Sequence, residues 1–240
     1  MSKFQIEQAF WQLFPQCEIG VVVLHGINNS EEGCEPVRPE MIEQLEKANL
    51  EAKKYLTEAV FSQNQVVAVW RQAFTQFKTK KGARSSIEAL LKRIEKGNEV
   101  GLINPLVDLY NTVSLRYGLP CGGEDLDCFV GDLRLTVTAG NDVFLALGDE
   151  ESDLTLPGEV CYLDEEGAVC RCWNWRDGQR TMLTEDTQNA ILVIESVDPS
   201  RHPDLLAAVD FLAKTAVQYL GGKASTKILT REDAEFDLAD

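Results

Sequence analysis

The sequence lacks several features that would assign it to a common class of protein. No apolar run approaches the ~20 residues that a membrane-spanning helix needs. The first residues, MSKFQIEQAFWQLF, do not have the charged start and continuous hydrophobic block of an export signal. There is no Gly-x-Ser-x-Gly motif, no phosphate-binding loop and no dinucleotide fingerprint. We therefore expect a soluble, cytoplasmic protein with no membrane partner and with none of the commonest catalytic motifs.

Histidine is scarce, and the cysteines are not spaced as metal ligands. The 240 residues include 2 histidines and 7 cysteines. Only Cys170 and Cys172 are close together, whereas zinc sites use paired short spacings. An odd number of cysteines without an export signal favours reduced thiols. We predict neither a metal nor a cofactor.

Positive charge is scarce overall but concentrated in one window. The chain has 23 Lys and Arg against 39 Asp and Glu, and the net charge of −16 argues against a DNA-binding protein or a general nucleic-acid coat. Between Arg71 and Lys96, however, eight cations accompany only two acids, a net charge of +6. This window either contacts the end of an RNA or is a solvated helix face. The candidate RNA-binding residues are Lys78, Lys80, Lys81 and Arg84.

The spacing of apolar residues predicts mainly helices in the first half of the chain and mainly strands in the second. Helices are expected over 4–14, 40–62, 66–77, 85–96, 105–117 and 203–220. Strands are expected over 19–24, 133–138, 143–146, 159–164, 168–175, 181–184 and 191–197. This order is typical of an α+β fold with a closing helix. We expect a single domain over 1–240, with 221–240 as a flexible acidic tail.

The segment 101–132 combines a clearly delimited helix with a polar corner. Asn104 can cap a helix that has Pro105 in its first turn, and Gly118 ends it. A glycine turn over 121–123 would then let backbone approach a ligand, just before Glu124. Glu124 and the acids at 125 and 127 either bind a cation or an amino group, or cap backbone N–H groups.

A second unusual segment is CRCWNWRDGQRT, residues 170–181. If it is a strand, Trp173 and Trp175 lie on one face, and Asn174 and Arg176 lie on the other. Aromatic rings beside guanidinium groups can hold a base or an aromatic amino acid. The same residues can equally pack a core.

A series of short motifs stands in order across residues 84–197. They are INPLVD from Ile103 to Asp108, Asn111, Leu119-Pro120, Asp125-Leu126-Asp127, GDLRL from Gly131, Glu159, the Gly178 turn, Thr187-Gln188-Asn189 and the strand that ends at Glu195. Together these motifs resemble a known family, the tandem B-three/B-four editing domain of the phenylalanyl-tRNA synthetase beta subunit. The upstream RSSIEALLKR is similar to the free-standing branch of that family.

The resemblance implies a fold and an activity. The fold would have a helical N-terminal half packed on a β-rich, sandwich-like C-terminal half. The activity would be hydrolysis of a misacylated aminoacyl-tRNA in trans, with the tRNA acceptor end and an amino-acid-like small molecule as partners. The implied catalytic residues are Asn111 and Glu195, to which we add Glu124 as a group that positions water. Expected substrate-binding residues are Gly122, Gly123, Trp175, Arg176 and Gly178.

Two positions depart from the pattern of the family, and they leave a second hypothesis open. Gly122 occupies the position of the family's histidine, and Tyr110 that of its threonine. A pocket without the imidazole need not accept tyrosine or hydrolyse an ester. The alternative is therefore a non-enzymatic binding module for a free amino acid or a related small molecule.

Overall fold

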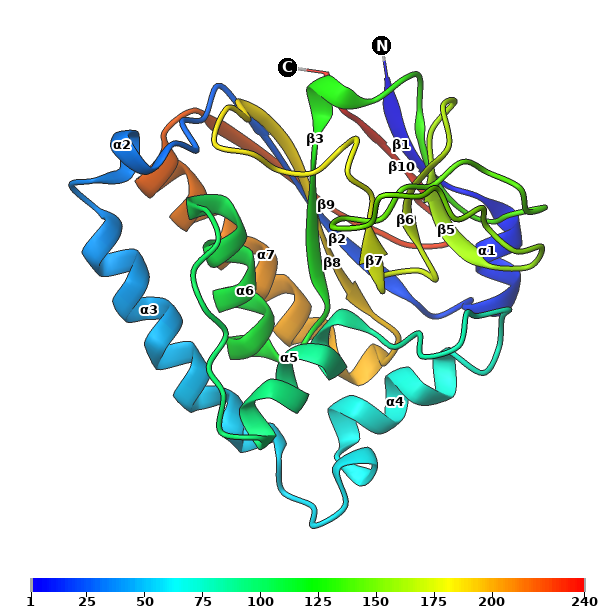
Figure 1. Ribbon diagram of the computed structural model, residues 1–240, viewed down its shortest axis with the longest axis horizontal. Helices are drawn as coiled ribbons and strands as arrows, with labels where there is room; N and C mark the ends of the chain where they lie inside the picture. The colour runs from blue at the N-terminus through cyan, green and yellow to red at the C-terminus, as the bar shows by residue number, and fades with distance from the viewer. Residues whose placement is uncertain (1, 240) are drawn as a thin grey trace.

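The computed structural model describes residues 2–239, which form an α+β fold with two sheets (Figure 1). One sheet has six strands in the order β10-β1-β4-β5-β6-β7, and the other has four in the order β3-β8-β2-β9. The strands are β1 (Lys3–Ile6), β2 (Glu18–His25), β3 (Cys121–Asp125), β4 (Leu133–Val137), β5 (Val160–Leu163), β6 (Ala168–Arg171), β7 (Arg176–Asp177), β8 (Asn189–Ser196), β9 (Lys223–Leu229) and β10 (Glu235–Asp237). The α-helices are α1 (Gln8–Leu13), α2 (Glu31–Cys34), α3 (Arg38–Glu51), α4 (Gln65–Ala73), α5 (Ser86–Glu95), α6 (Pro105–Tyr117) and α7 (His202–Leu220).

Strand β2 separates two hydrophobic cores because successive side chains of a strand point to opposite faces. Val22 and Leu24 point toward α6 and α7, which cover one face of the four-stranded sheet (Figure 1). Ile19, Val21 and Val23 belong to the core that the four-stranded sheet shares with the six-stranded one. The continuous apolar run of β2 thus follows from burial on both faces, and the predicted α+β, sandwich-like fold is confirmed.

Helices α5 and α6 begin as their local signals predict. The Ser85 Oγ accepts a hydrogen bond from the Glu88 N–H at 3.4 Å, and the Asn104 Oδ1 accepts one from the Val107 N–H at 3.1 Å. Gly118 ends α6 in the left-handed conformation, with φ of 61°. These caps satisfy backbone groups that the helix itself leaves without partners.

Residues 221–239 do not form the flexible tail that we expected over 221–240. Strand β9 pairs antiparallel with β2 along seven residues, from Ile19↔Leu229 to His25↔Lys223. Strand β10 pairs with β1, so the first and last strands of the chain lie side by side (Figure 1). The prediction failed because β9 is an edge strand whose first residues, KAST, are exposed, so that their polarity resembles that of an unstructured tail.

Other local predictions also differ from the structure. The expected helix over 4–14 begins as strand β1, and only Gln8–Leu13 is helical. The segments 143–146 and 181–184 form isolated bridges rather than strands. The glycine-rich segment 121–123 is part of β3, not a turn, because it pairs with β8 from Cys121↔Ile194 onward.

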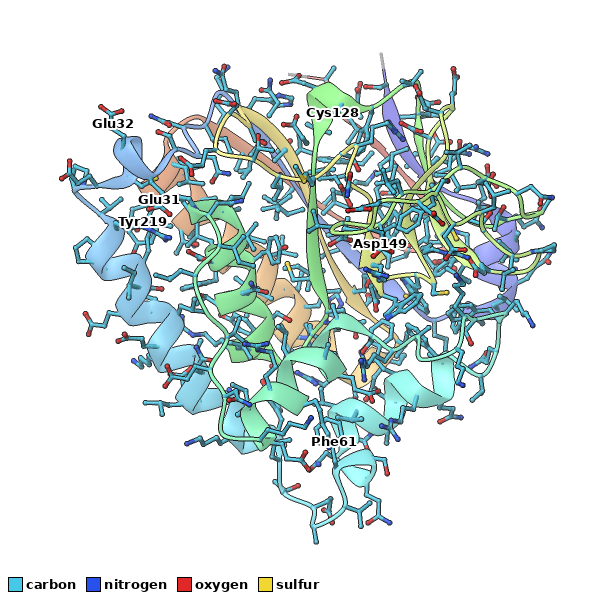
Figure 2. All side chains as sticks on the ribbon, viewed as in Figure 1. Glu31, Glu32, Phe61, Cys128, Asp149 and Tyr219 are labelled. Atoms are coloured by element: carbon cyan, nitrogen blue, oxygen red, sulfur yellow. The ribbon has the colours of Figure 1, made fainter. Side chains whose placement is uncertain are left out.

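Helix α7 is tied to α3 by a polar contact that Figure 2 helps to locate. The Tyr219 hydroxyl donates to the Glu40 Oε1 and accepts from the Gln44 Nε2, both at 2.6 Å.

Among residues 2–239, no helix is long and apolar enough to cross a membrane. The seven cysteines are free thiols, and only Cys128 is exposed (Figure 2).

Candidate functional site

A cavity lies between the two sheets, beside β3 and the end of β8. The space inside it for the centres of water-sized molecules is about 70 Å³, several times the about 10–15 Å³ that one water requires. The four-stranded sheet contributes Cys121, Gly122, Gly123 and Glu124 from β3 and Ile191, Val193 and Glu195 from β8. The six-stranded sheet contributes Leu133, Tyr162, Val169, Cys170 and Asp177, and the lining is completed by Ser86, Asn174 and Trp175.

Glu195 is the polar group that the structure holds most firmly in this cavity. Its side chain is buried, with 1% of the residue exposed. The Tyr162 hydroxyl donates to its Oε1 at 2.5 Å, and the Asn174 amide donates to its Oε2. Burial raises the pKa of Glu195 to about 7, although these two hydrogen bonds act in the opposite direction. The carboxyl therefore changes its protonation state near neutral pH.

Glu124 and Asp177 are two further carboxyl groups on the cavity wall. Burial, and next the charge of Asp177, raise the pKa of Glu124 well above its ordinary value. Burial also raises the pKa of Asp177. Glu124 is 7% exposed, and its Oε2 is buried without a hydrogen-bond partner among the residues described. Such an atom is costly unless a ligand or a proton satisfies it.

The two glycines of β3 have different roles. A Cβ on Gly122 would meet no atom within 4 Å, and Gly122 lies on the cavity wall. A Cβ on Gly123 would overlap the Leu192 side chain, on the helix-covered face of the sheet. Gly123 therefore allows close packing, whereas Gly122 leaves the cavity open.

The segment 170–175 does not continue as one strand. Cys172 and Trp173 have positive φ values, 47° and 65°, so β6 ends at Arg171. Trp173 turns into the core, where its ring centroid lies 5.0 Å from those of Phe10 and Trp70. Trp175 instead reaches the cavity. The core-packing interpretation is therefore correct for Trp173, and the expected alternation of the two tryptophans on one strand is wrong.

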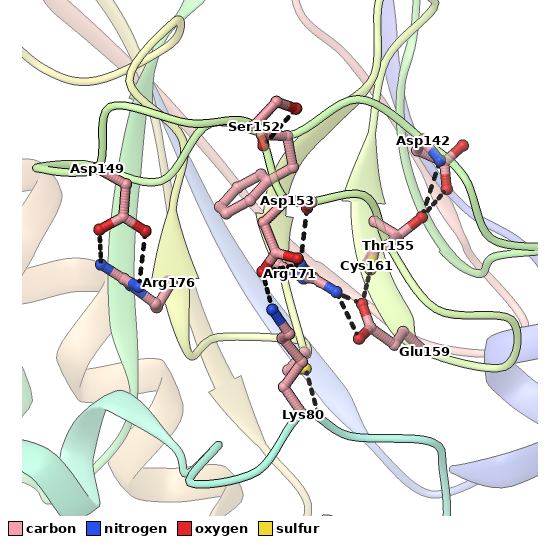
Figure 3. Close-up of polar contacts among 12 residues, drawn as sticks. Lys80, Asp142, Asp149, Ser152, Asp153, Thr155, Glu159, Cys161, Arg171 and Arg176 are labelled. Carbon is pink, nitrogen blue, oxygen red and sulfur yellow. Dashed lines mark hydrogen bonds and ion pairs between the residues drawn. The ribbon is translucent and has the colours of Figure 1, made fainter.

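The basic segment 78–84 leads directly to the cavity wall, because Ser86 is the first residue of α5. Lys78, Lys81 and Arg84 are exposed. Lys80 is engaged by Asp153, which also pairs with Arg171 at 2.9 Å (Figure 3). One of the four candidate RNA-binding cations is thus held by an acid of the same chain.

Three of the predicted site residues do not line the cavity. Asn111 is buried on α6, which packs on the helix-covered side of the four-stranded sheet. Arg176 forms an ion pair with Asp149 at 3.1 Å (Figure 3). Gly178 packs against the Val169 carbonyl and forms an isolated bridge with Ala146. Five of the predicted residues, Glu124, Glu195, Gly122, Gly123 and Trp175, therefore line one cavity, and the roles of all eight stay predictions.

Sequence reasoning missed Asp177, Tyr162 and Asn174 as cavity residues. Asp177 resembles a turn residue before Gly178, and Tyr162 resembles one more apolar residue of a strand. Their meeting with Glu195 depends on strand pairing between distant segments, for which the local sequence contains no signal. Within residues 2–239, no group of three or more His, Cys, Asp or Glu side chains is arranged to hold a metal ion.

Comparisons with known proteins agree with this architecture. No curated protein matches the sequence. A solved N-terminal fragment of the phenylalanyl-tRNA synthetase beta subunit from Pyrococcus horikoshii has a similar fold, with a TM-score of 0.50 and 12% sequence identity. The match covers 92% of this chain but only 49% of that fragment. The family model of the B3/4 domain matches residues 69–205, which contain β3 to β8 and all the residues that line the cavity. The chain belongs to the B3/4 domain family.

Proposed function

We propose that the protein binds the aminoacyl end of a tRNA and hydrolyses its ester bond in trans. The observation that carries this proposal is Glu195, a buried carboxyl with a pKa of about 7 that lines the cavity between the two sheets. A general base works best when its pKa lies near the working pH. Membership of the B3/4 family and the similarity to a phenylalanyl-tRNA synthetase fragment support the assignment to tRNA.

The proposed reaction needs no covalent nucleophile because an aminoacyl ester is already activated. Ionised Glu195 accepts a proton from a water molecule whose oxygen bonds to the ester carbonyl carbon. The carbon–oxygen bond to the terminal ribose then breaks, and the proton passes to the ribose oxygen. The products are a free amino acid and an uncharged tRNA. Tyr162 and Asn174 orient the base through their hydrogen bonds to its two oxygens.

The thiols of the cavity are poorly suited to act instead of Glu195. Burial, followed by the negative charge of Glu195, raises the pKa of Cys121 well above its ordinary value. Burial also raises the pKa of Cys170, with Asp177 as the next cause. A nucleophilic cysteine requires the opposite, a lowered pKa.

Deacylation of a panel of mischarged tRNAs tests the reaction. We expect the wild-type protein to release at least one amino acid faster than spontaneous hydrolysis, with a rate that rises as the pH passes through about 7. Glu195→Gln should lower this rate by a factor of about 10²–10⁴. Glu150→Gln, at an exposed position outside the cavity, is the control. If no member of the panel is deacylated at any pH, the hydrolytic function is wrong.

Binding of tRNA tests the basic segment separately. Lys81→Ala with Arg84→Ala should weaken binding of uncharged tRNA, and should reduce the slope of log affinity against log salt by roughly 0.7–0.9 for each phosphate that the segment no longer neutralises. Lys214→Ala, on the exposed side of α7, should leave both unchanged. Equal salt slopes in all three proteins would exclude the segment as an RNA contact.

A non-enzymatic binding module for a free amino acid is the second candidate. It is favoured by the net charge of −16 and by the ion pair that occupies Lys80. Stabilisation against heating by a free amino acid, without any deacylation, would support it.

A further inference from the structure

The charge of the cavity indicates what kind of ligand can enter it. Its lining contains three carboxyl groups, Glu124, Asp177 and Glu195, and no Lys, Arg or His. The arginines nearest to Asp177 in sequence are both engaged elsewhere: Arg176 pairs with Asp149 at 3.1 Å, and Arg180 pairs with Asp164 at 2.7 Å. The ion pairs among residues 2–239 include none to the three cavity carboxyls. A positively charged ligand would supply the cation that these carboxyl groups lack.

Glu124 differs from Glu195 in its hydrogen-bond partners. Glu195 has a donor on each oxygen, Tyr162 on one and Asn174 on the other. Glu124 has an Oε2 that is buried without a partner, and the Ser86 Oγ on the cavity wall is also buried without one. These unpartnered atoms are independent of the charge argument, and they too call for a polar ligand group.

The same lining is unfavourable for a negatively charged group. A free amino acid has a carboxylate as well as an ammonium, and no cation of the lining can pair with that carboxylate. The burial that raises the pKa values of Glu124 and Asp177 shows that this site disfavours negative charge, and a bound carboxylate would add a further one. An ester or an amide of the amino acid keeps the ammonium but has no negative charge. The apolar side chains of Leu133, Ile191 and Val193 can cover the rest of such a ligand.

We propose that Glu124 and Asp177 form an ammonium-binding subsite beside Glu195, which selects amino acids whose carboxyl group is masked as an ester or an amide. This inference rests on the proposed function, since it takes the aminoacyl end of a tRNA as the natural ligand. It adds the specificity-determining pair and the charge class of the substrate. It also explains how a protein could act on an aminoacyl ester in the presence of free amino acids, because the free forms are rejected by charge.

Binding of stable analogues tests the subsite without any hydrolysis. The probes are three matched compounds: an L-amino acid amide, the free L-amino acid and the N-acetylated amide, each made for methionine, phenylalanine and leucine, whose side chains carry no charge. Calorimetry or thermal-shift titration with the wild-type protein should show binding of at least one amide. The free acid and the N-acetylated amide of the same residue should bind at least about tenfold more weakly, because one adds a negative charge and the other removes the ammonium.

Two near-isosteric variants assign the subsite to its residues. Glu124→Gln and Asp177→Asn should each weaken amide binding by about tenfold or more and leave the free acid no weaker than before, while Glu150→Gln changes neither. Melting temperatures report whether each variant is folded, and the comparison of the three probes on the wild-type protein does not depend on any variant.

The possible outcomes separate this inference from the proposed function. If aminoacyl-tRNA is hydrolysed but free acids bind as tightly as amides, the subsite is wrong and the hydrolytic function stands. If amides are preferred and no tRNA is deacylated, the subsite stands and the hydrolytic function is wrong. Failure of all three amides to bind would overturn the subsite.

Discussion

Two buried glutamates of this protein, Glu159 and Glu195, have opposite electrostatic surroundings. Glu159 is fully buried and pairs with Arg171 at 2.7 Å, and Arg171 itself is 1% exposed (Figure 3). Glu195 is equally buried, but its partners are the neutral side chains of Tyr162 and Asn174. The two side chains are 0% and 1% exposed, so burial alone does not distinguish them. The difference is that the charge of Glu159 is balanced within the chain, whereas the charge of Glu195 is left for a proton or a ligand.

The Glu159–Arg171 pair extends into a network that supports the loop at 149–155 and the basic segment. Arg171 donates to the Asp153 carbonyl at 2.8 Å and pairs with the Asp153 carboxylate, which in turn engages Lys80. The Cys161 thiol completes the network by contacting the Glu159 Oε2 at 3.7 Å. A network whose polar groups all have partners holds the surrounding structure in place, whereas a cavity with polar groups that lack partners is suited to binding a ligand.

The largest expected effect is on the balanced pair. Arg171→Met leaves Glu159 buried without a cation, which should lower the free energy of unfolding by about 3–5 kcal/mol. Urea denaturation measures the change. The double variant Arg171→Met with Glu159→Leu removes the stranded charge and should regain much of the loss. If the single variant is as stable as the wild type, Glu159 does not depend on Arg171 and the comparison fails.

The next effect concerns the pH dependence of the unbalanced carboxyl. A carboxyl whose folded pKa is about 7 rather than the ordinary 4.5 binds its proton more tightly in the folded state. The contribution of this carboxyl to the free energy of unfolding is fully present below about pH 4.5 and is lost as the pH rises to about 7. At roughly 1.4 kcal/mol per pH unit, the loss amounts to about 3 kcal/mol. Glu195→Gln cannot lose a proton, so its stability relative to the wild type should rise over this range. Denaturation series at several pH values would show this, and parallel curves for the two proteins would contradict it.

The two glycines of β3 test whether the cavity is a place for a ligand or part of the packing. Gly122→Leu should fill open space, so its stability should stay within about 0.5 kcal/mol of the wild type, while deacylation and amide binding are lost. Gly123→Ala pushes a methyl group against Leu192 and should lower stability by about 1–3 kcal/mol. Thermal melts and deacylation rates of both variants show whether the cavity is needed for stability or for activity. A strongly destabilised Gly122→Leu would show that the cavity is needed for folding.

The smallest effect is expected at the surface. Arg176 and Asp149 form a pair whose side chains are 37% and 42% exposed. Arg176→Met should therefore change stability by only about 0–1 kcal/mol, in contrast to Arg171→Met a few residues earlier on the same hairpin. A loss as large as that of Arg171→Met would mean that exposure does not explain the difference between the two arginines.

Short-range signals predicted much of the fold correctly. The cap at Asn104, the helix end at Gly118 and the apolar runs of β2 and β8 each depend on residues that are close together in the chain. The family resemblance identified Glu195, and the acidic corner drew attention to Glu124. Predictions failed where long-range pairing decided the outcome: segment 121–123 became a strand through β8, and the polar end of the chain became β9 through β2.

The sequence by itself determined the helices, the most apolar strands and the family, because helix caps, apolar periodicity and ordered motifs are written in consecutive residues. Only the tertiary structure decided which polar groups share the cavity. Asp177, Glu124 and Glu195 lie on three strands of two different sheets, and Tyr162 and Asn174 reach Glu195 across the gap between those sheets. The chemistry of the site, three carboxyls and no cation in the lining of one cavity, follows from this packing and not from any one segment.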